Sequence, residues 1–236
     1  MASNSGIEWT ETTWNPVTGC SKVSDGCKHC YAERMSRRLQ AMGLDKYGRG
    51  FQVAQHPGTL EAPCGWASPR LVFVNSMSDL FHEAVEPRFI QSVFRVMNSC
   101  PRHTFQVLTK RPQRALALDR SLNWTRNIWL GVSIESRRWS ARARTLRMTS
   151  AQTKFLSLEP LLGPLPGLDL SGIDWVIAGG ESGPGARPVH RDWIREIRDA
   201  CVRHEVPFFF KQWGGVNKKH AGRLLDGTTW DEMPAR

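Results

Sequence analysis

Three of the six cysteines lie close together, in the segment TGCSKVSDGCKHCYAERM (residues 18–35). Cys20, Cys27 and Cys30 have the spacing C-x6-C-x2-C. Cysteine thiolates bind zinc and iron–sulfur clusters, and two residues between cysteines is a recurrent ligand spacing. Gly19 and Gly26 each precede a cysteine, and glycine lets a loop backbone fold closely around a bound group. The trio therefore indicates a metal or cluster site.

The number of thiols decides between the candidate ligands. A structural zinc ion takes four protein ligands, and no second cysteine pair is present because Cys64, Cys100 and Cys201 are isolated in the sequence. Zinc remains open as an alternative, with Cys64 or a histidine as the fourth ligand. A redox pair would leave one thiol unused. Three thiolates on a [4Fe–4S] cluster leave one iron open to a small chelating molecule, so we expect such a cluster on Cys20, Cys27 and Cys30.

Short apolar runs alternate with helical patterns along the chain. Each run is rich in apolar or β-branched residues and is bounded by polar or turn residues, as a strand buried on both faces requires. The runs are RLVFVNS (70–76), HTFQVLTK (103–110), NIWLGVS (127–133), TKFLSLE (153–159), DWVIAGG (174–180) and VPFFFKQW (206–213), with a short strand expected around 6–16. Apolar spacing predicts helices over 31–42, 86–98 and 190–203. The alternation predicts an α/β fold with parallel strands.

Polar clusters follow the strands at their C-terminal ends. Glu135, Glu159 and a GGESG loop (179–183) stand directly after buried runs. Active sites of (β/α) barrels are assembled from the loops at that face, whereas open sheets concentrate such residues at one switch point. We therefore expect a partial or complete (β/α) TIM-like barrel, with the cysteines in its first strand-to-helix loop.

Domain boundaries follow from composition. Residues 1–213 are predicted to form the barrel domain, with an insertion or lid over the Gly- and Pro-rich residues 43–69 and a C-terminal tail over 214–236. The first residues lack the pattern of a secretory signal. The sequence contains no run of eighteen apolar residues, so we expect no membrane-spanning segment. We expect a cytoplasmic protein, in the host cytoplasm if phage-encoded, with reduced thiols; this argues against disulfides.

The cysteine loop resembles that of the radical S-adenosylmethionine (radical SAM) superfamily. The usual superfamily spacing is C-x3-C-x2-C, so the first gap departs from it and the second matches. WNPVTGCSKVSDGCKHCYAERM, VNSMSDLF, LTKRP, GVSIES, LSLEPLLGP and AGGESGPGARP together resemble a phage-associated three-cysteine-motif family. The resemblance implies a [4Fe–4S] enzyme that cleaves S-adenosylmethionine reductively, with an external electron donor, and abstracts a hydrogen atom with the adenosyl radical.

The resemblance also implies roles for polar residues beyond the cysteines. The expected cofactor-binding residues are Ser76, Ser78 and Asp79 at the methionyl amine, Lys110 and Arg111 at its carboxylate, Ser133 and Glu135 at the ribose hydroxyls, and Gly179, Gly180 and Glu181 at the adenine. An alternative interpretation is that Glu135 and Glu159 pair with neighbouring arginines and that the two glycines form a tight turn.

Charge and aromatic content bear on the substrate. The net charge is +10, and several of the ten tryptophans lie in polar or loop contexts. Basic side chains bind phosphates and aromatic rings stack on extruded bases, so we expect a DNA substrate that carries a modified base. With the phage resemblance, the hypothesis is an isomerase acting on amino-acid-modified thymidine. The alternatives are a radical SAM enzyme for a small molecule or peptide and a zinc-stabilised nucleic-acid-binding protein.

Overall fold

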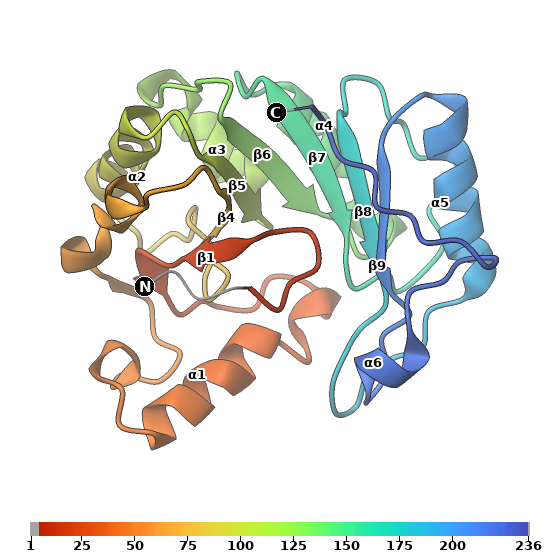
Figure 1. Cartoon of the computed structure of the whole chain (residues 1–236), viewed down its shortest axis with the longest axis horizontal. Coiled ribbons are helices and arrows are strands. Elements are labelled where there is room, and N and C mark those ends of the chain that lie inside the picture. Colours follow the sequence, from red (N-terminus) through yellow and green to blue (C-terminus); the bar gives the residue numbers. More distant parts are fainter. Residues whose placement is uncertain (1–4, 236) are drawn as a thin grey trace.

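The core of the protein is a curled sheet of seven parallel strands, seen in a computed structural model that describes residues 5–235 (Figure 1). The strand order is β1-β4-β5-β6-β7-β8-β9, so each strand pairs with the next one that enters the sheet. The bounds are β1 Thr12–Trp14, β4 Leu71–Val74, β5 Thr104–Thr109, β6 Ile128–Ser133, β7 Thr153–Leu158, β8 Trp175–Gly179 and β9 Phe208–Gln212. The sheet is a half-barrel, which confirms the α/β fold and the partial-barrel prediction.

The strands form because they are buried along most of their length. Every residue of β6 and of β8 is buried, and the alternate faces of both strands belong to two apolar clusters. A parallel sheet covered on both faces needs such continuous apolar runs. The six apolar runs of the sequence are therefore confirmed as strands to within a few residues at each end, whereas the strand expected around 6–16 is limited to Thr12–Trp14.

Helices between the strands cover the outside of the curl (Figure 1). They are α2 Pro87–Ser99, α3 Pro112–Leu118, α4 Ala141–Arg147 and α5 Arg191–Arg203. Helix α2 buries Ile90, Val93, Phe94 and Met97 against the sheet, and a proline begins it. Helix α1 (Tyr31–Ala41) lies apart from these four, below β1, and α6 (Lys218–Ala221) is a short turn near the C-terminus.

A small antiparallel sheet joins the expected insertion to the cysteine loop. Strand β2 (Val17–Thr18) pairs with β3 (Ala54–Gln55), and the amide of Cys20 donates to the carbonyl of Phe51 over 3.2 Å. Gly19 has a φ of 79°, and a Cβ there would lie 2.1 Å from the carbonyl oxygen of Gln52. Residues 43–69 therefore support the backbone just before the first cysteine.

The last residues pack back onto the sheet. Trp175 Nε1 donates to the carbonyl of Glu232 over 2.8 Å, and the Phe208 amide donates to the Glu232 carboxylate over 2.9 Å. The division into a barrel over 1–213 and a tail over 214–236 stays a prediction, and residues 1–4 and 236 lie outside the described residues. Within the described range, no helix is long and apolar enough to cross a membrane.

Candidate active site

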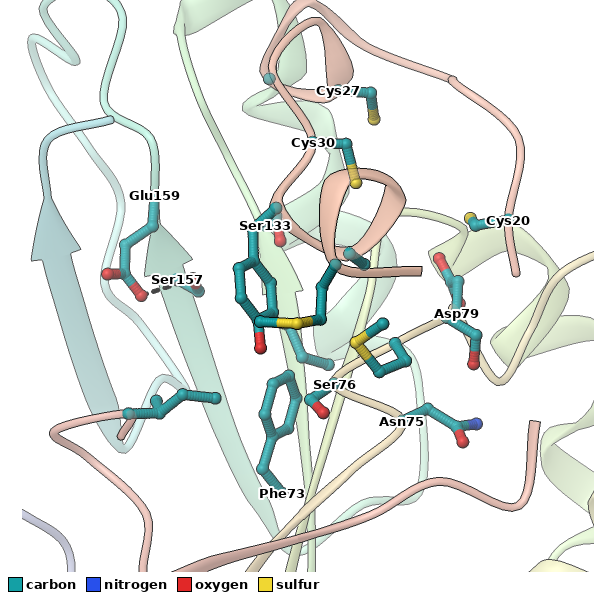
Figure 2. Close-up of a pocket in the computed structure, with 18 of the residues that line it drawn as sticks. Cys20, Cys27, Cys30, Phe73, Asn75, Ser76, Asp79, Ser133, Ser157 and Glu159 are labelled. Carbon is teal, nitrogen blue, oxygen red and sulfur yellow. Dashed lines mark hydrogen bonds between the residues drawn. The ribbon is translucent and has the colours of Figure 1, made fainter. Parts of the chain in front are cut away.

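A cavity of about 670 Å³ lies at the C-terminal ends of the parallel strands (Figure 2). All the predicted site residues line it except Glu135 and Gly179, which lie behind its wall. The parallel arrangement produces this convergence, because every strand ends at the same edge of the sheet.

The three clustered cysteines share one end of this cavity (Figure 2). All three are free thiols and are half-buried. Cys27 ends a 3-10 turn (Asp25–Cys27), and Cys30 immediately precedes α1. Figure 2 shows Cys27 and Cys30 beside each other and Cys20 across an open space. The loop therefore presents three separate sulfur donors to one region.

Two of these sulfurs, those of Cys20 and Cys27, have a cationic side chain nearby. Cys20 Sγ accepts from Arg111 Nη1 over 3.5 Å, and Cys27 Sγ lies 3.6 Å from Ser24 Oγ. Burial and the charge of Asp79 raise the pKa of Cys20 to about 11, against the opposing effect of Arg111. Burial also opposes ionisation of Cys27, but the Lys110 ammonium and local hydrogen bonds outweigh it and lower its pKa. Burial raises the pKa of Cys30, although the amides of the first turn of α1 favour its thiolate.

These residues fit an iron–sulfur cluster. Among residues 5–235, no three His, Cys, Asp or Glu side chains gather as a site for a single metal ion. A cubane makes a different demand, because its thiolates bind different iron atoms and so stand apart around it. Three unpaired thiols at one end of the cavity meet that demand. Arg111 and Lys110 beside them would offset the negative charge of a thiolate-bound cluster.

Asp79 organises the ends of β4 and β5. Its Oδ1 accepts from the Phe81 amide over 3.0 Å and from Thr109 Oγ1 over 2.7 Å. Its Oδ2 accepts from the Lys110 amide over 3.0 Å and from Arg111 Nη1 over 3.2 Å. The carboxylate is therefore held rigidly at the cavity wall with four donors already in place.

The two serines near Asp79 are held by the loop that leads to the cysteines. Ser76 Oγ donates to Asn15 Oδ1 over 3.2 Å, and Ser78 Oγ donates to the carbonyl of Val17 over 3.0 Å. These bonds tie the loop after β4 to the segment after β1.

The two predicted carboxylate-binding cations are paired with carboxylates of the protein. Lys110 Nζ pairs with Glu135, and Arg111 Nε donates to both oxygens of Glu83, over 3.1 and 2.9 Å. Arg111 also donates to Ser21 Oγ over 2.9 Å, which ties it to the cysteine loop.

Glu135 is fully buried and joins three segments. Its Oε2 accepts from Arg142 Nη1 over 2.9 Å, and its Oε1 accepts from Ser24 Oγ over 2.5 Å. Burial opposes its ionisation, but Lys110, Ser24 and Arg142 lower its pKa below the ordinary value. Ser133, by contrast, lines the cavity, and its carbonyl accepts from Arg142 over 2.8 Å.

The GGESG loop positions one carboxylate. Glu181 pairs with Arg187, whose Nη2 lies 2.5 Å from Oε1, and with His29 Nδ1 at 3.1 Å. Burial opposes ionisation here too, but the Arg187 and His29 hydrogen bonds lower the pKa of Glu181 to about 2. A Cβ on Gly180 would lie 2.0 Å from the carbonyl oxygen of Trp213, so glycine allows β8 and β9 to end close together.

Several cavity residues are absent from the predicted set. Glu159 pairs with Lys211 at 3.1 Å and accepts from Ser157 Oγ over 3.3 Å. Asn75 has a φ of 61°, and its buried Nδ2 has no partner among the described residues. Both residues stand directly after a strand, a position that marks Glu159 as notable in the sequence although no cofactor role was predicted for it.

Two of the other three cysteines differ from expectation. Cys64 and Cys100 form a disulfide, so the prediction of reduced thiols is wrong for this pair and Cys64 is no fourth zinc ligand. The turn over Ala62–Gly65 lies against the end of α2. The spacing of Cys64 and Cys100 in the sequence does not predict this contact. Cys201 is fully buried on α5.

Comparisons with known proteins place the fold and the family. Spore photoproduct lyase complexed with dinucleoside spore photoproduct has a similar fold, with a TM-score of 0.50 and 14% identity over 84% of this chain and 63% of that chain. A double mutant of that lyase with bound AdoMet and dinucleoside spore photoproduct matches with a TM-score of 0.49 and the same identity and coverage. The chain thus spans 63% of the length of these structures. No curated protein matches its sequence. A family profile described as "Protein of unknown function (DUF5131)" matches residues 4–234, and the chain therefore belongs to that family.

Proposed function

We propose that this protein is a radical SAM enzyme whose Cys20, Cys27 and Cys30 hold a [4Fe–4S] cluster. The observation that carries the proposal is the placement of three free thiols at one end of a cavity of about 670 Å³, above the C-terminal ends of a half-barrel. Three thiols leave room at the cluster for a chelating molecule, and the rest of the cavity provides the space for S-adenosylmethionine. When bound, the cluster and S-adenosylmethionine would supply reductive cleavage of the sulfonium carbon–sulfur bond and hydrogen-atom abstraction.

The surrounding residues would position the cofactor. Ser76, Ser78 and Asp79 lie at the cavity wall where the methionyl amine is expected, and Asp79 is held in place by its four donors. Ser133 faces the cavity as a candidate ribose contact, and Gly180 and Glu181 line the wall proposed for the adenine.

Lys110 and Arg111 would have to bind the methionyl carboxylate while they also contact carboxylates of the protein. Both line the cavity, but Lys110 is paired with Glu135 and Arg111 with Glu83 and Asp79. Glu135 and Gly179 lie behind the wall, so their proposed contribution is to hold Lys110, the cysteine loop and the end of β8 in place.

A base in DNA is the proposed substrate class. The net charge of +10 favours a polyanion, and a protein of similar fold is complexed with a dinucleoside photoproduct. The narrower hypothesis is an isomerase that rearranges an amino-acid-modified thymidine in phage DNA.

Cofactor loading and cleavage test the proposal directly. Protein purified without oxygen should be brown, contain iron and sulfide, and release 5′-deoxyadenosine from S-adenosylmethionine when dithionite is added. Mass spectrometry measures this product. A colourless protein loaded with zinc would contradict the proposal and favour a zinc-stabilised nucleic-acid-binding protein.

Substrate class is tested separately. Duplex DNA should bind with an affinity that falls steeply with salt, and DNA with an amino-acid-modified thymidine should increase 5′-deoxyadenosine release over unmodified DNA. Cleavage without salt-sensitive DNA binding would point to a small molecule or peptide instead.

A further inference from the structure

A second cavity, of about 480 Å³, lies behind the cysteine loop. It is bounded by the segments that begin α3 and α4 and by Val23, which lies between Cys20 and Cys27. Five cationic side chains line it, and Glu83 is the single acidic residue among its described lining residues. The cations are Lys110, Arg111, Arg114, Arg138 and Arg142. We call this cavity the basic groove.

The basic groove shares a wall with the candidate active site. Val23, Lys110 and Arg111 line both cavities. Arg111 Nη1 lies 3.5 Å from Cys20 Sγ, so one guanidinium separates the groove from a proposed cluster ligand. The groove and the main cavity therefore meet at a shared wall beside Cys20.

Two of the groove's cations carry a charge that no carboxylate of the described residues neutralises. Arg114 donates to the carbonyls of His82 and Val85, which carry no net charge. The Arg138 guanidinium lies 5.2 Å from the centre of the Trp139 ring and is exposed. No carboxylate of residues 5–235 pairs with either arginine, whereas Asp79, Glu83 and Glu135 neutralise the other three. The groove thus presents a net positive surface.

We propose that the basic groove is the docking surface of an acidic one-electron carrier protein. The inference rests on the proposed function, in which each cleavage consumes one electron. With S-adenosylmethionine and a substrate in the main cavity, the electron has to reach the cysteines from outside it. In each cleavage the carrier would be oxidised by one electron, which would cross the wall of Val23 and Arg111. The carbon–sulfur bond would then break to give methionine and a 5′-deoxyadenosyl radical, and this radical would become 5′-deoxyadenosine by taking a hydrogen atom from the substrate.

The same wall argues against a nucleic acid in this groove. Val23, Lys110 and Arg111 close it off from the main cavity, so a strand lying here would have no path for its base to the reacting end. An acidic protein needs only proximity and opposite charge, and complementary charge mainly accelerates association.

Arg138→Glu tests the proposal, because Arg138 is exposed and contacts neither the cysteines nor the main cavity. Release of 5′-deoxyadenosine is measured with dithionite and, separately, with reduced flavodoxin, an acidic flavoprotein. We expect the flavodoxin-driven rate to fall about tenfold while the dithionite-driven rate is unchanged. Gln113→Lys, which adds a charge at the exposed rim, should raise the flavodoxin-driven rate. Arg203→Glu, an exposed charge reversal at the end of α5, is the matched control and should change neither.

The outcomes separate the two proposals. Absence of cleavage with dithionite in the unaltered protein would overturn the proposed function itself. Dithionite-driven cleavage with equal flavodoxin-driven rates in Arg138→Glu and the unaltered protein would overturn the docking surface alone. Loss of DNA binding in Arg138→Glu, with an unchanged flavodoxin rate, would assign the groove to nucleic acid and also overturn it.

Discussion

The cysteine loop and the remaining cysteines use the same side chain in opposite ways. Cys20, Cys27 and Cys30 are free and half-buried at a cavity, whereas Cys64 and Cys100 are joined and Cys201 is sealed in the core. Burial raises the pKa of Cys201 to about 12, so it stays a protonated apolar filler. The pKa of Cys27 falls, because Lys110 and local hydrogen bonds outweigh burial. The feature that separates the three loop cysteines from Cys201 is their position at the cavity, because burial raises the pKa of Cys20 and Cys30 as well.

The largest expected difference is between substitutions of Cys27 and Cys201. Cys27→Ala should remove essentially all cluster iron and all S-adenosylmethionine cleavage, because two thiols cannot hold the cubane in place. Iron and sulfide analysis measures this loss. Cys201→Ala is the control: it should keep full iron and lose about 1 kcal/mol of the free energy of unfolding. Iron retained in Cys27→Ala, or lost in Cys201→Ala, would contradict this division of the cysteines.

The second test removes the support of the cysteine loop. Glu135→Gln leaves Lys110 and Arg142 without their buried counter-charge and weakens the bond from Ser24. We expect the free energy of unfolding to fall by about 3–5 kcal/mol, measured by urea denaturation. Glu83→Gln, at an exposed rim position, should cost less than about 1 kcal/mol. Equal losses in the two variants would show that burial of Glu135 is unimportant.

The third test concerns the disulfide. Cys100→Ser should lower the free energy of unfolding of the oxidised protein by about 2–4 kcal/mol, because the bond constrains the unfolded chain. Iron content should not change, since Cys64 and Cys100 do not line the cavity. Denaturation and iron analysis on the same samples check both parts. Coupled loss of iron would place this pair in the cluster site.

The smallest expected effect is the pH dependence of Glu181, which contacts His29 in the cysteine loop. Its pKa is lowered to about 2, so its stabilisation is complete above the unfolded value of about 4.5 and is lost as the pH falls toward 2. Because acid also destroys clusters, the comparison uses Cys27→Ala protein with and without Glu181→Gln. The difference in unfolding free energy should shrink between pH 5 and pH 3. A constant difference would show that the carboxylate charge contributes nothing.

The long, regular elements were predictable because local pattern and burial agree in them. The predicted helix over 86–98 corresponds to Pro87–Ser99, and the predicted run 127–133 contains Ile128–Ser133. Helices α3 and α4 have seven residues each, which is too few for apolar periodicity to identify. The alternative interpretation, that Glu135 and Glu159 pair with neighbouring arginines, holds for Glu135, which contacts Arg142, whereas Glu159 pairs with a lysine, Lys211.

The alternation of strands and helices, the apolar faces and the spacing of three cysteines in one loop can be predicted without coordinates, because these features depend on residues that are neighbours along the chain. The tertiary structure alone decided that Arg111 lies against Cys20, that Glu135 joins Lys110, Arg142 and Ser24, and that Cys64 meets Cys100. Except for the pair of Glu135 with Arg142, each of these contacts joins residues that are far apart in the sequence. Their meeting depends on the curl of the sheet, which brings the ends of distant strands together and which no local pattern encodes.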